Sequence, residues 1–186
     1  MGVVLTTIMP PRAAHRYVER GTIETLSQSV AKARVVTVSS PAGFGKTTAM
    51  LRWADILKEE GRPVLWIAAR AGVDSLDTFL EALQMACIGA GLDAEKFNAG
   101  LTPRSWLAML SVQSGPRPVL FIDDAQLLTG DVRDFIGQLI SSARDSLTTV
   151  IASRGESGIN LARMRSLGHL AEVTVRHLSL DHDEAM

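Results

Sequence analysis

The segment from Ser40 to Thr48, SPAGFGKTT, brings small residues, two glycines, a lysine and two threonines together in nine positions. Glycines let consecutive backbone N–H groups turn toward one point, and the start of a following helix adds its partial positive charge. Lys46 would then bridge the outer two phosphates of a nucleoside triphosphate, and Thr47 would offer its hydroxyl to magnesium. The segment is therefore predicted to be a phosphate-binding loop that takes ATP together with magnesium.

This loop departs from the usual pattern G-x-x-x-x-G-K-[ST], because its first glycine is replaced by Ser40. A chance loop between a strand and a helix is the alternative interpretation. The glycine-lysine-threonine end is intact, and the segment follows a predicted strand and opens a predicted helix, which favours the phosphate site. The predicted nucleotide contacts within it are Ser40, Pro41, Ala42, Gly43, Phe44, Gly45, Lys46, Thr47 and Thr48.

A second chemical element is VLFIDD, an apolar run that ends in two carboxylates at Asp123 and Asp124. An acid at the carboxyl end of a buried strand is typical of a group that holds magnesium, and Asp123 is predicted to do so, through water. Asp124 is the candidate general base that polarises an attacking water. A simple turn or helix cap would also explain two aspartates here, but their position downstream of the glycine loop favours the catalytic interpretation.

A third element is TVIASR, in which Arg154 follows another apolar strand. Such an arginine is usually a solvated surface residue. If the strand that precedes it lies between the first and third strands, however, Arg154 faces the γ-phosphate and is predicted to bind the nucleotide there, sensing whether that phosphate is present.

The elements that must position these residues alternate between apolar strands and amphipathic helices. Strands are predicted at 35–39, 63–69, 119–123, 147–153 and 170–175. Helices are predicted at 23–30 and 47–60, from Asp74 or Ser75 to 88, from Thr102 and Asp131 onward, and at 160–167. Strands that are apolar on both faces indicate a sheet covered on both sides. The fold class is therefore α/β, a three-layer sandwich with a mainly parallel five-stranded sheet.

The composition limits the classes of function. The 186 residues are 46% hydrophobic and 21% charged, which suits one globular domain, and the net charge of −1 argues against an electrostatic grip on nucleic acid by the whole domain. The only cysteine, Cys87, excludes an internal disulfide and is expected to be a packed thiol. No apolar run is long enough to cross a membrane, so a cytoplasmic location is expected.

Other residues favour structural interpretations. The three tryptophans lie in apolar patterns and are expected in the core: Trp53, Trp66 and Trp106. Four residues near the end have the types of metal ligands but no fixed ligand spacing, and we interpret them as a solvated chain end: His177, Asp181, His182 and Asp183.

The order of these segments resembles the nucleotide-binding domain of the large ATP-binding LuxR-type, maltose-regulator-like transcription regulators, which belong to the STAND class of signal-transduction ATPases. The resemblance covers residues 15–185 and rests on SSPAGFGKTT, PVLWIAA, DTFLEAL, VLFIDDAQLL, TVIASR and HLSLDHDEA. In that group the loop commonly begins S/A-P-A-G, so Ser40 is part of the likeness. The resemblance implies a P-loop NTPase core of the ASCE, AAA-like kind.

The resemblance also implies a switch more than a metabolic enzyme. ADP would hold a resting form, an inducer and ATP would favour an open form that self-associates, and slow hydrolysis would reset it, which makes the domain a weak ATPase at most. Lys46 and Thr47 match the loop lysine and threonine of the family, Asp123 and Asp124 match its paired acids, and Arg154 matches its γ-phosphate-sensing arginine. The segment 16–21 matches the stretch that helps enclose the adenine.

Domain expectations follow from the same likeness. Residues 1–14 are expected to be a tail, 15–180 the nucleotide-binding domain, and 181–186 the truncated start of the next helical module. Family members continue with a winged helix, an inducer-sensing repeat array and a DNA-reading helix-turn-helix. We therefore expect no direct DNA binding by this segment.

Two other functions stay open. An oligomeric ATPase motor, such as a transposition or secretion helper, would need an arginine from a neighbouring subunit, and Arg144, Arg163 and Arg165 are available. A small-molecule kinase would need an acceptor pocket and a lid, for which only SRGESGINLARMR lies between the fourth and fifth strands.

Overall fold

A computed structural model of the chain describes residues 8, 10–11, 33–69, 73, 75–92, 102–111, 115–143 and 145–178. Several predictions from the sequence lie outside these residues. They are the helix at 23–30, the segment 16–21 expected at the adenine, most of the tail at 1–14, and the chain end at 181–186.

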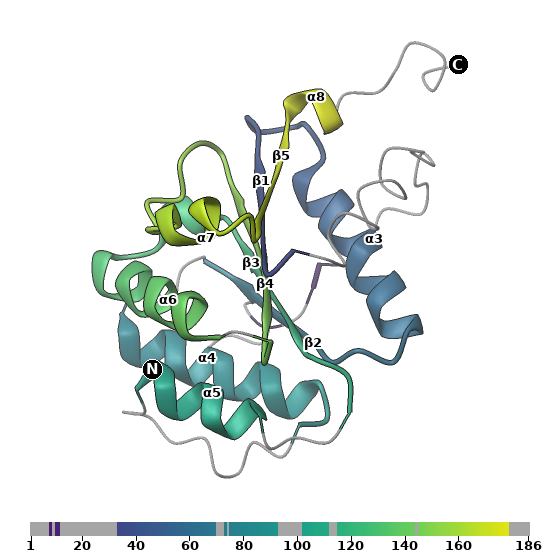
Figure 1. Ribbon diagram of the computed structural model, residues 1–186. Coiled ribbons are helices and arrows are strands. Elements are labelled where there is room, and N and C mark those ends of the chain that lie inside the picture. Colours follow the sequence, from purple (N-terminus) through teal and green to yellow (C-terminus); the bar gives the residue numbers. More distant parts are fainter. Residues whose placement is uncertain are drawn as a thin grey trace.

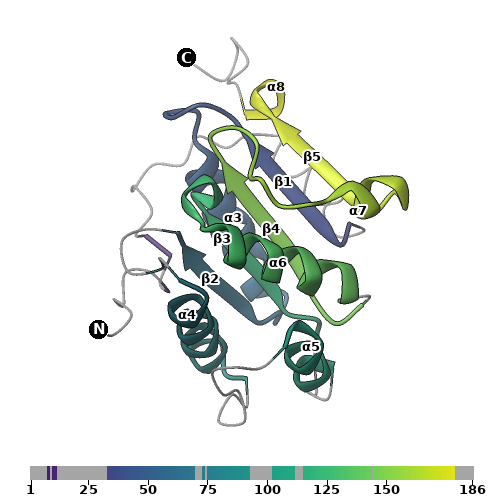
Figure 2. The same cartoon turned by 90° about the vertical axis from the view of Figure 1, so that its left-hand side faces the viewer.

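Five strands form one sheet in which every pair of neighbours is parallel. The strands are β1 (Val35–Ser39), β2 (Val64–Ala68), β3 (Val119–Asp123), β4 (Thr148–Ser153) and β5 (Leu170–Thr174). Their order across the sheet is β2-β3-β4-β1-β5, and Figure 2 shows the strands side by side between the helices. The predicted five-stranded parallel sheet is confirmed, and the fourth strand lies between the first and the third, which was the condition on the expected position of Arg154.

Helices cover both faces of the sheet, as a parallel sheet requires. The helices are α3 (Lys46–Glu59), α4 (Leu76–Gly89), α5 (Pro103–Ser111), the 3-10 turn η1 (Ala125–Leu127), α6 (Gly130–Ser142), α7 (Ala162–Ser166) and α8 (Val175–Leu178). Figure 1 shows α3 on one side of the sheet and α4, α5, α6 and α7 on the other. The three-layer α/β sandwich is therefore confirmed.

Each face of the sheet has its own apolar cluster. On the α3 side, Trp66 of β2 stacks on Phe121 of β3 with ring centroids 5.5 Å apart. On the opposite side, Phe79 of α4 meets Phe135 of α6 edge to face at 6.1 Å. All residues of β3 and of β4 are buried, so these two neighbouring strands lie at the centre of the core.

The residues expected in the core lie there. Trp53, Trp66 and Trp106 are each at most 2% exposed. Cys87 is buried on α4, and desolvation raises the pKa of its thiol to about 12, so it stays protonated and packs as a small apolar side chain. Among the described helices, none combines the length and the hydropathy that crossing a bilayer requires.

Helix starts differ slightly from the predictions. Ser75, one of the two residues predicted to cap this helix, caps α4. Its hydroxyl accepts from the N–H of Thr78, and its own N–H donates to the hydroxyl of Thr78. In contrast, α6 begins at Gly130 after Thr129, one residue before the predicted Asp131. The Asp131 carboxylate instead accepts hydrogen bonds from the Thr129 hydroxyl and from the backbone N–H of Leu76, which links the start of α6 to that of α4.

Truncating a core side chain tests this packing. Ile136 on α6 is fully buried, so Ile136→Ala is expected to lower the free energy of unfolding by about 2–5 kcal/mol in denaturant titrations, because it leaves a cavity. The matched control is Ile88→Ala on α4, whose side chain is 55% exposed, and its effect should stay within about 0.5 kcal/mol. Equal losses at the two positions would contradict the assignment of Ile136 to the core.

Candidate nucleotide-binding site

The parallel sheet brings the segments after β1, β3 and β4 to one edge, because these strands are neighbours and all end there. The register pairs Ser39 of β1 with Ser153 of β4. Ser40 and Arg154, which follow these residues, therefore begin adjacent loops, and the backbone N–H of Ser40 donates to the carbonyl of Ser153 at 3.4 Å.

The loop between β1 and α3 has the backbone of an anion site. Gly43 and Gly45 adopt φ values of 87° and 76°, which residues other than glycine rarely adopt. Gly45 precedes the first residue of α3, and no side chain caps the helix there. The first N–H groups of α3 are thus left for a ligand, together with the positive end of the helix dipole. Ser40 is not among the described residues with positive φ, which explains why serine fits where the usual pattern has glycine.

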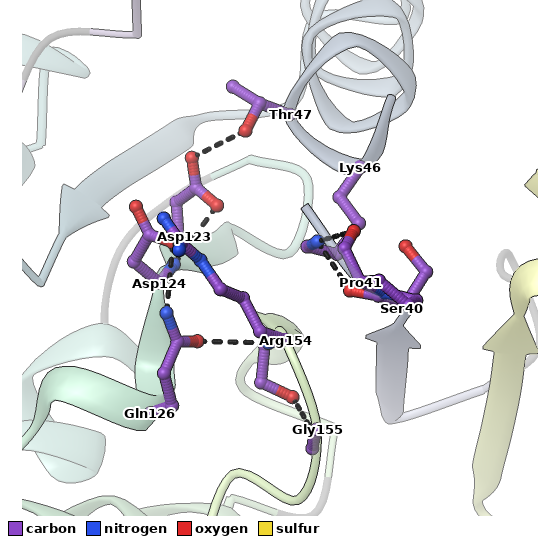
Figure 3. A network of polar contacts seen from close by, with 10 residues as sticks. Ser40, Pro41, Lys46, Thr47, Asp123, Asp124, Gln126, Arg154 and Gly155 are labelled. Carbon is purple, nitrogen blue, oxygen red and sulfur yellow. Dashed lines mark hydrogen bonds and ion pairs between the residues drawn. The ribbon is translucent and has the colours of Figure 1, made fainter. Parts of the chain in front are cut away.

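Lys46 lies folded onto its own loop. Its Nζ donates to the carbonyl oxygens of Ser40 at 2.6 Å and Pro41 at 2.8 Å, and the residue is only 8% exposed (Figure 3). Burial lowers the pKa of its ammonium, and the carboxylates of Asp124 and Asp123 act in the opposite direction. A buried ammonium held by neutral carbonyls is a group that an anionic ligand would stabilise.

Thr47 and Asp123 form the second contact of the site. The Thr47 hydroxyl donates to Asp123 Oδ2 at 2.9 Å, and the backbone N–H of Asp124 donates to Asp123 Oδ1 at 3.0 Å. Asp123 is 1% exposed, so these bonds fix its orientation. A hydroxyl and a carboxylate oxygen are ligand types that magnesium prefers, so this pair fits the ion.

Asp124 is the only described residue other than glycine that has a positive φ, at 55°. This left-handed turn, directly after β3, separates the side chain of Asp124 from that of Asp123. Asp124 Oδ1 lies 3.8 Å from the Nε of Arg154 and accepts a hydrogen bond from Gln126 Nε2 at 3.0 Å. The second acid is therefore joined to the end of β4, as Figure 3 shows.

The remaining predicted residues lie around this centre. The side chain of Arg154 is 61% exposed and can reach outward from its position beside Asp124. Ser40 is buried, and its hydroxyl has no hydrogen-bond partner among the residues that the structure describes. Within the segment from Ser40 to Thr48, the exposed residues are Pro41, Ala42, Gly43, Phe44 and Thr48.

Sequence reasoning missed Gln126, whose side chain joins Asp124 to the backbone of Arg154. Its Oε1 accepts from the N–H of Arg154 at 3.0 Å. The only signal in the sequence is its place two residues after the paired acids, and a glutamine there looks like any polar turn residue. Its role depends on a contact 28 positions along the chain, which no local pattern reveals.

Comparisons with known proteins concern the sequence and the fold of the chain as a whole. No model of a known protein family matches the chain. The HTH-type transcriptional regulator MalT of Cronobacter sakazakii is 29% identical over 187 aligned positions, which cover 95% of this chain. The match covers 20% of MalT, so the chain spans a fifth of the length of this curated relative.

Solved structures show the same fold at low sequence identity. A Walker-type ATPase of Pyrococcus abyssi superposes with a TM-score of 0.57 at 12% identity, over 94% of this chain and 58% of that one. A chain in the structure of Drosophila ORC bound to poly(dA/dT) DNA and Cdc6 superposes with a TM-score of 0.54 at 11% identity, over 82% of this chain and 28% of that one. The resemblance stated from the motifs is therefore confirmed. The aligned 95% of the chain is homologous to a MalT-type transcriptional regulator, and the chain has the fold of the P-loop ATPases.

Proposed function

We propose that the domain, taken as residues 15–180, binds ATP and ADP with magnesium and acts as the nucleotide-dependent switch of a MalT-like transcription regulator. The observation that carries the proposal is the convergence of three separate segments on one cluster of side chains. Lys46 and Thr47 come from the loop after β1, Asp123 and Asp124 from the end of β3, and Arg154 from the end of β4.

The loop from Ser40 to Thr48 would hold the phosphates. A phosphate oxygen can replace the two carbonyls that Lys46 now contacts, and it offers the ammonium a full negative charge in their place. Magnesium would enter between the hydroxyl of Thr47 and the carboxylate of Asp123, directly or through water, and neutralise the outer phosphates. Nucleotide binding would therefore break the contacts of Lys46 with the loop carbonyls and the bond between Thr47 and Asp123.

Arg154 and Asp124 would act on the γ-phosphate. The guanidinium of Arg154 is mostly exposed and only 3.8 Å from a carboxylate oxygen of Asp124, so an added anion can draw it away at little cost. Asp124 would polarise the attacking water as a general base. Hydrolysis is expected to be slow, as a reset of the switch, because the family resemblance implies a phosphate that is sensed more than consumed.

The homology with MalT favours the switch over other ATPase roles. The chain spans 20% of that protein, and we propose that a winged helix, an inducer-sensing array and a DNA-reading helix-turn-helix belong to the rest of the full-length regulator. DNA reading is assigned to those parts and not to this segment, whose net charge is −1. ATP-driven self-association would be the output of the switch.

The second candidate function is an oligomeric motor, and one observation bears on it. Arg163 lies exposed on α7, where it could reach a neighbouring subunit, whereas Arg165 is paired with Glu172 at 2.7 Å. Arg144 lies outside the described residues. The rate of turnover separates this function from a switch.

Replacing the loop lysine tests nucleotide binding itself. Lys46→Ala is expected to abolish ATP binding in isothermal titration calorimetry with magnesium, because the charge that faces the phosphates is lost. Lys58→Ala, an exposed lysine on the same helix, is the matched control and should bind as the wild type does. An unchanged affinity in Lys46→Ala would refute the phosphate-binding loop.

Comparing ATP with ADP tests the sensor. Arg154→Ala should weaken ATP binding by about 10-fold or more, the cost of losing a charged hydrogen bond, and leave ADP affinity within about twofold. Arg104→Ala on α5, also exposed, is the control for removing a surface arginine. If Arg154→Ala weakens both nucleotides equally, Arg154 does not sense the γ-phosphate.

Steady-state turnover tests the switch against the motor and the kinase. We expect phosphate release by the purified chain to be far slower than about 1 s⁻¹, an ordinary enzyme rate. The measurement is repeated over a range of protein concentrations, because a motor completed by a neighbouring subunit becomes faster per chain as it assembles. Turnover above that rate would favour the motor or the kinase.

A further inference from the structure

Gln126 spans the gap between the two groups proposed to act on the γ-phosphate. Its Nε2 donates to Asp124 Oδ1 at 3.0 Å, and its Oε1 accepts from the backbone N–H of Arg154 at 3.0 Å. The orientation of the amide is fixed by its partners, because a carboxylate only accepts and an N–H only donates. One half-buried side chain thus joins the end of β3 to the end of β4 (Figure 3).

The backbone under Gln126 is itself held in place. The guanidinium of Arg133, from α6, donates to the carbonyl of Gln126 at 3.0 Å. The N–H of Leu127 donates to the carbonyl of Asp124 at 2.9 Å, which closes the 3-10 turn. The backbone of Gln126 is therefore held by Arg133 of α6, and its side chain binds the carboxylate of Asp124 and the N–H of Arg154.

From this geometry we propose that Gln126 is a positioning residue that couples Arg154 to Asp124 and thereby sets how strongly the site prefers ATP to ADP. The inference rests on the proposed function, since it names the residue through which γ-phosphate sensing is organised. Without the amide, the N–H of Arg154 and the carboxylate of Asp124 each lose one hydrogen bond. The 3.8 Å contact between the side chains of these two residues is then no longer held in place by Gln126.

The effect should fall on ATP and not on nucleotides in general. The hydrogen bonds of the Gln126 side chain go to the two residues that would face the γ-phosphate, whereas the bonds of Lys46 and Thr47 lie elsewhere in the site. ADP has no γ-phosphate, so its binding does not draw on Arg154. A change confined to the ratio of ATP to ADP affinity is therefore what this geometry predicts.

The test replaces Gln126 by leucine, which has a similar volume and no hydrogen-bonding groups, in the full chain. Isothermal titration calorimetry with magnesium then gives the affinities for ATP and ADP. Gln126→Leu should reduce the ratio of the two affinities by about fivefold, the net value of one hydrogen bond, with ADP affinity within about twofold of wild type. Gln138→Leu, the same change at an exposed position of α6, should leave the ratio unchanged.

A double-mutant cycle with Arg154→Ala shows whether the effect passes through that residue. Because Gln126 acts by holding Arg154, Gln126→Leu should lower the ratio little or not at all once Arg154 is alanine. An additive loss would overturn the inference, as would a wild-type ratio in Gln126→Leu or an equal loss of ATP and ADP affinity.

Gln126→Glu is the second variant if the leucine substitution prevents folding, which circular dichroism would reveal. It keeps an acceptor for the N–H of Arg154, but it removes the donor to Asp124 and adds a carboxylate that competes with the γ-phosphate for Arg154. The preference for ATP should fall at least as far as in the leucine variant, and a wild-type ratio would overturn the inference. Failure of the proposed function looks different, because the wild-type chain would then show no nucleotide binding that depends on Lys46.

Discussion

The parallel pairing of β4 between β1 and β3 is the constraint on which the rest of the site depends. Parallel strands end at the same edge, so this order places the loop after β1 beside the residues that follow β4 and brings Thr47 to the acid at the end of β3. The side chains of Lys46, Asp123 and Arg154 come together because of this strand order. The apolar clusters on both faces of the sheet matter for function because they fix this order.

Within that frame, each charged group of the site has a polar partner in the chain itself. The ammonium of Lys46 rests on loop carbonyls, Thr47 bonds to Asp123, and Asp124 lies between Gln126 and Arg154. Buried or half-buried charges are costly unless they have partners, so this self-contained network lets the domain keep its reactive groups in place without a ligand. In the proposed function, a nucleotide with magnesium would offer stronger partners to the same groups. Binding would then be an exchange of contacts, which is the property that a switch requires.

The sheet and the position of the loop residues could be predicted from local sequence patterns. The strands are continuous apolar runs, and the glycine-rich loop stands between a predicted strand and a predicted helix. The sheet and the position of Lys46 and Thr47 at the start of α3 therefore followed from local pattern. Other features depend on tertiary contacts that no local pattern encodes. The left-handed turn at Asp124 and the bridge made by Gln126 are of this kind, because both arise from the meeting of β3 and β4. The structure begins α6 at Gly130, one residue before the predicted Asp131, and the carboxylate of Asp131 accepts a hydrogen bond from the start of α4, a tertiary contact of the same kind.

In the proposed function, nucleotide phosphates replace the contacts that now close the loop. A crystal structure of the chain with magnesium and a non-hydrolysable ATP analogue would show this exchange. We expect Lys46 Nζ to leave the carbonyls of Ser40 and Pro41 for the phosphates, and magnesium to lie between Thr47 and Asp123. We also expect Arg154 to turn from Asp124 to the γ-phosphate. Phosphates bound elsewhere, or bound at the loop with Lys46 still held by both carbonyls, would contradict this exchange.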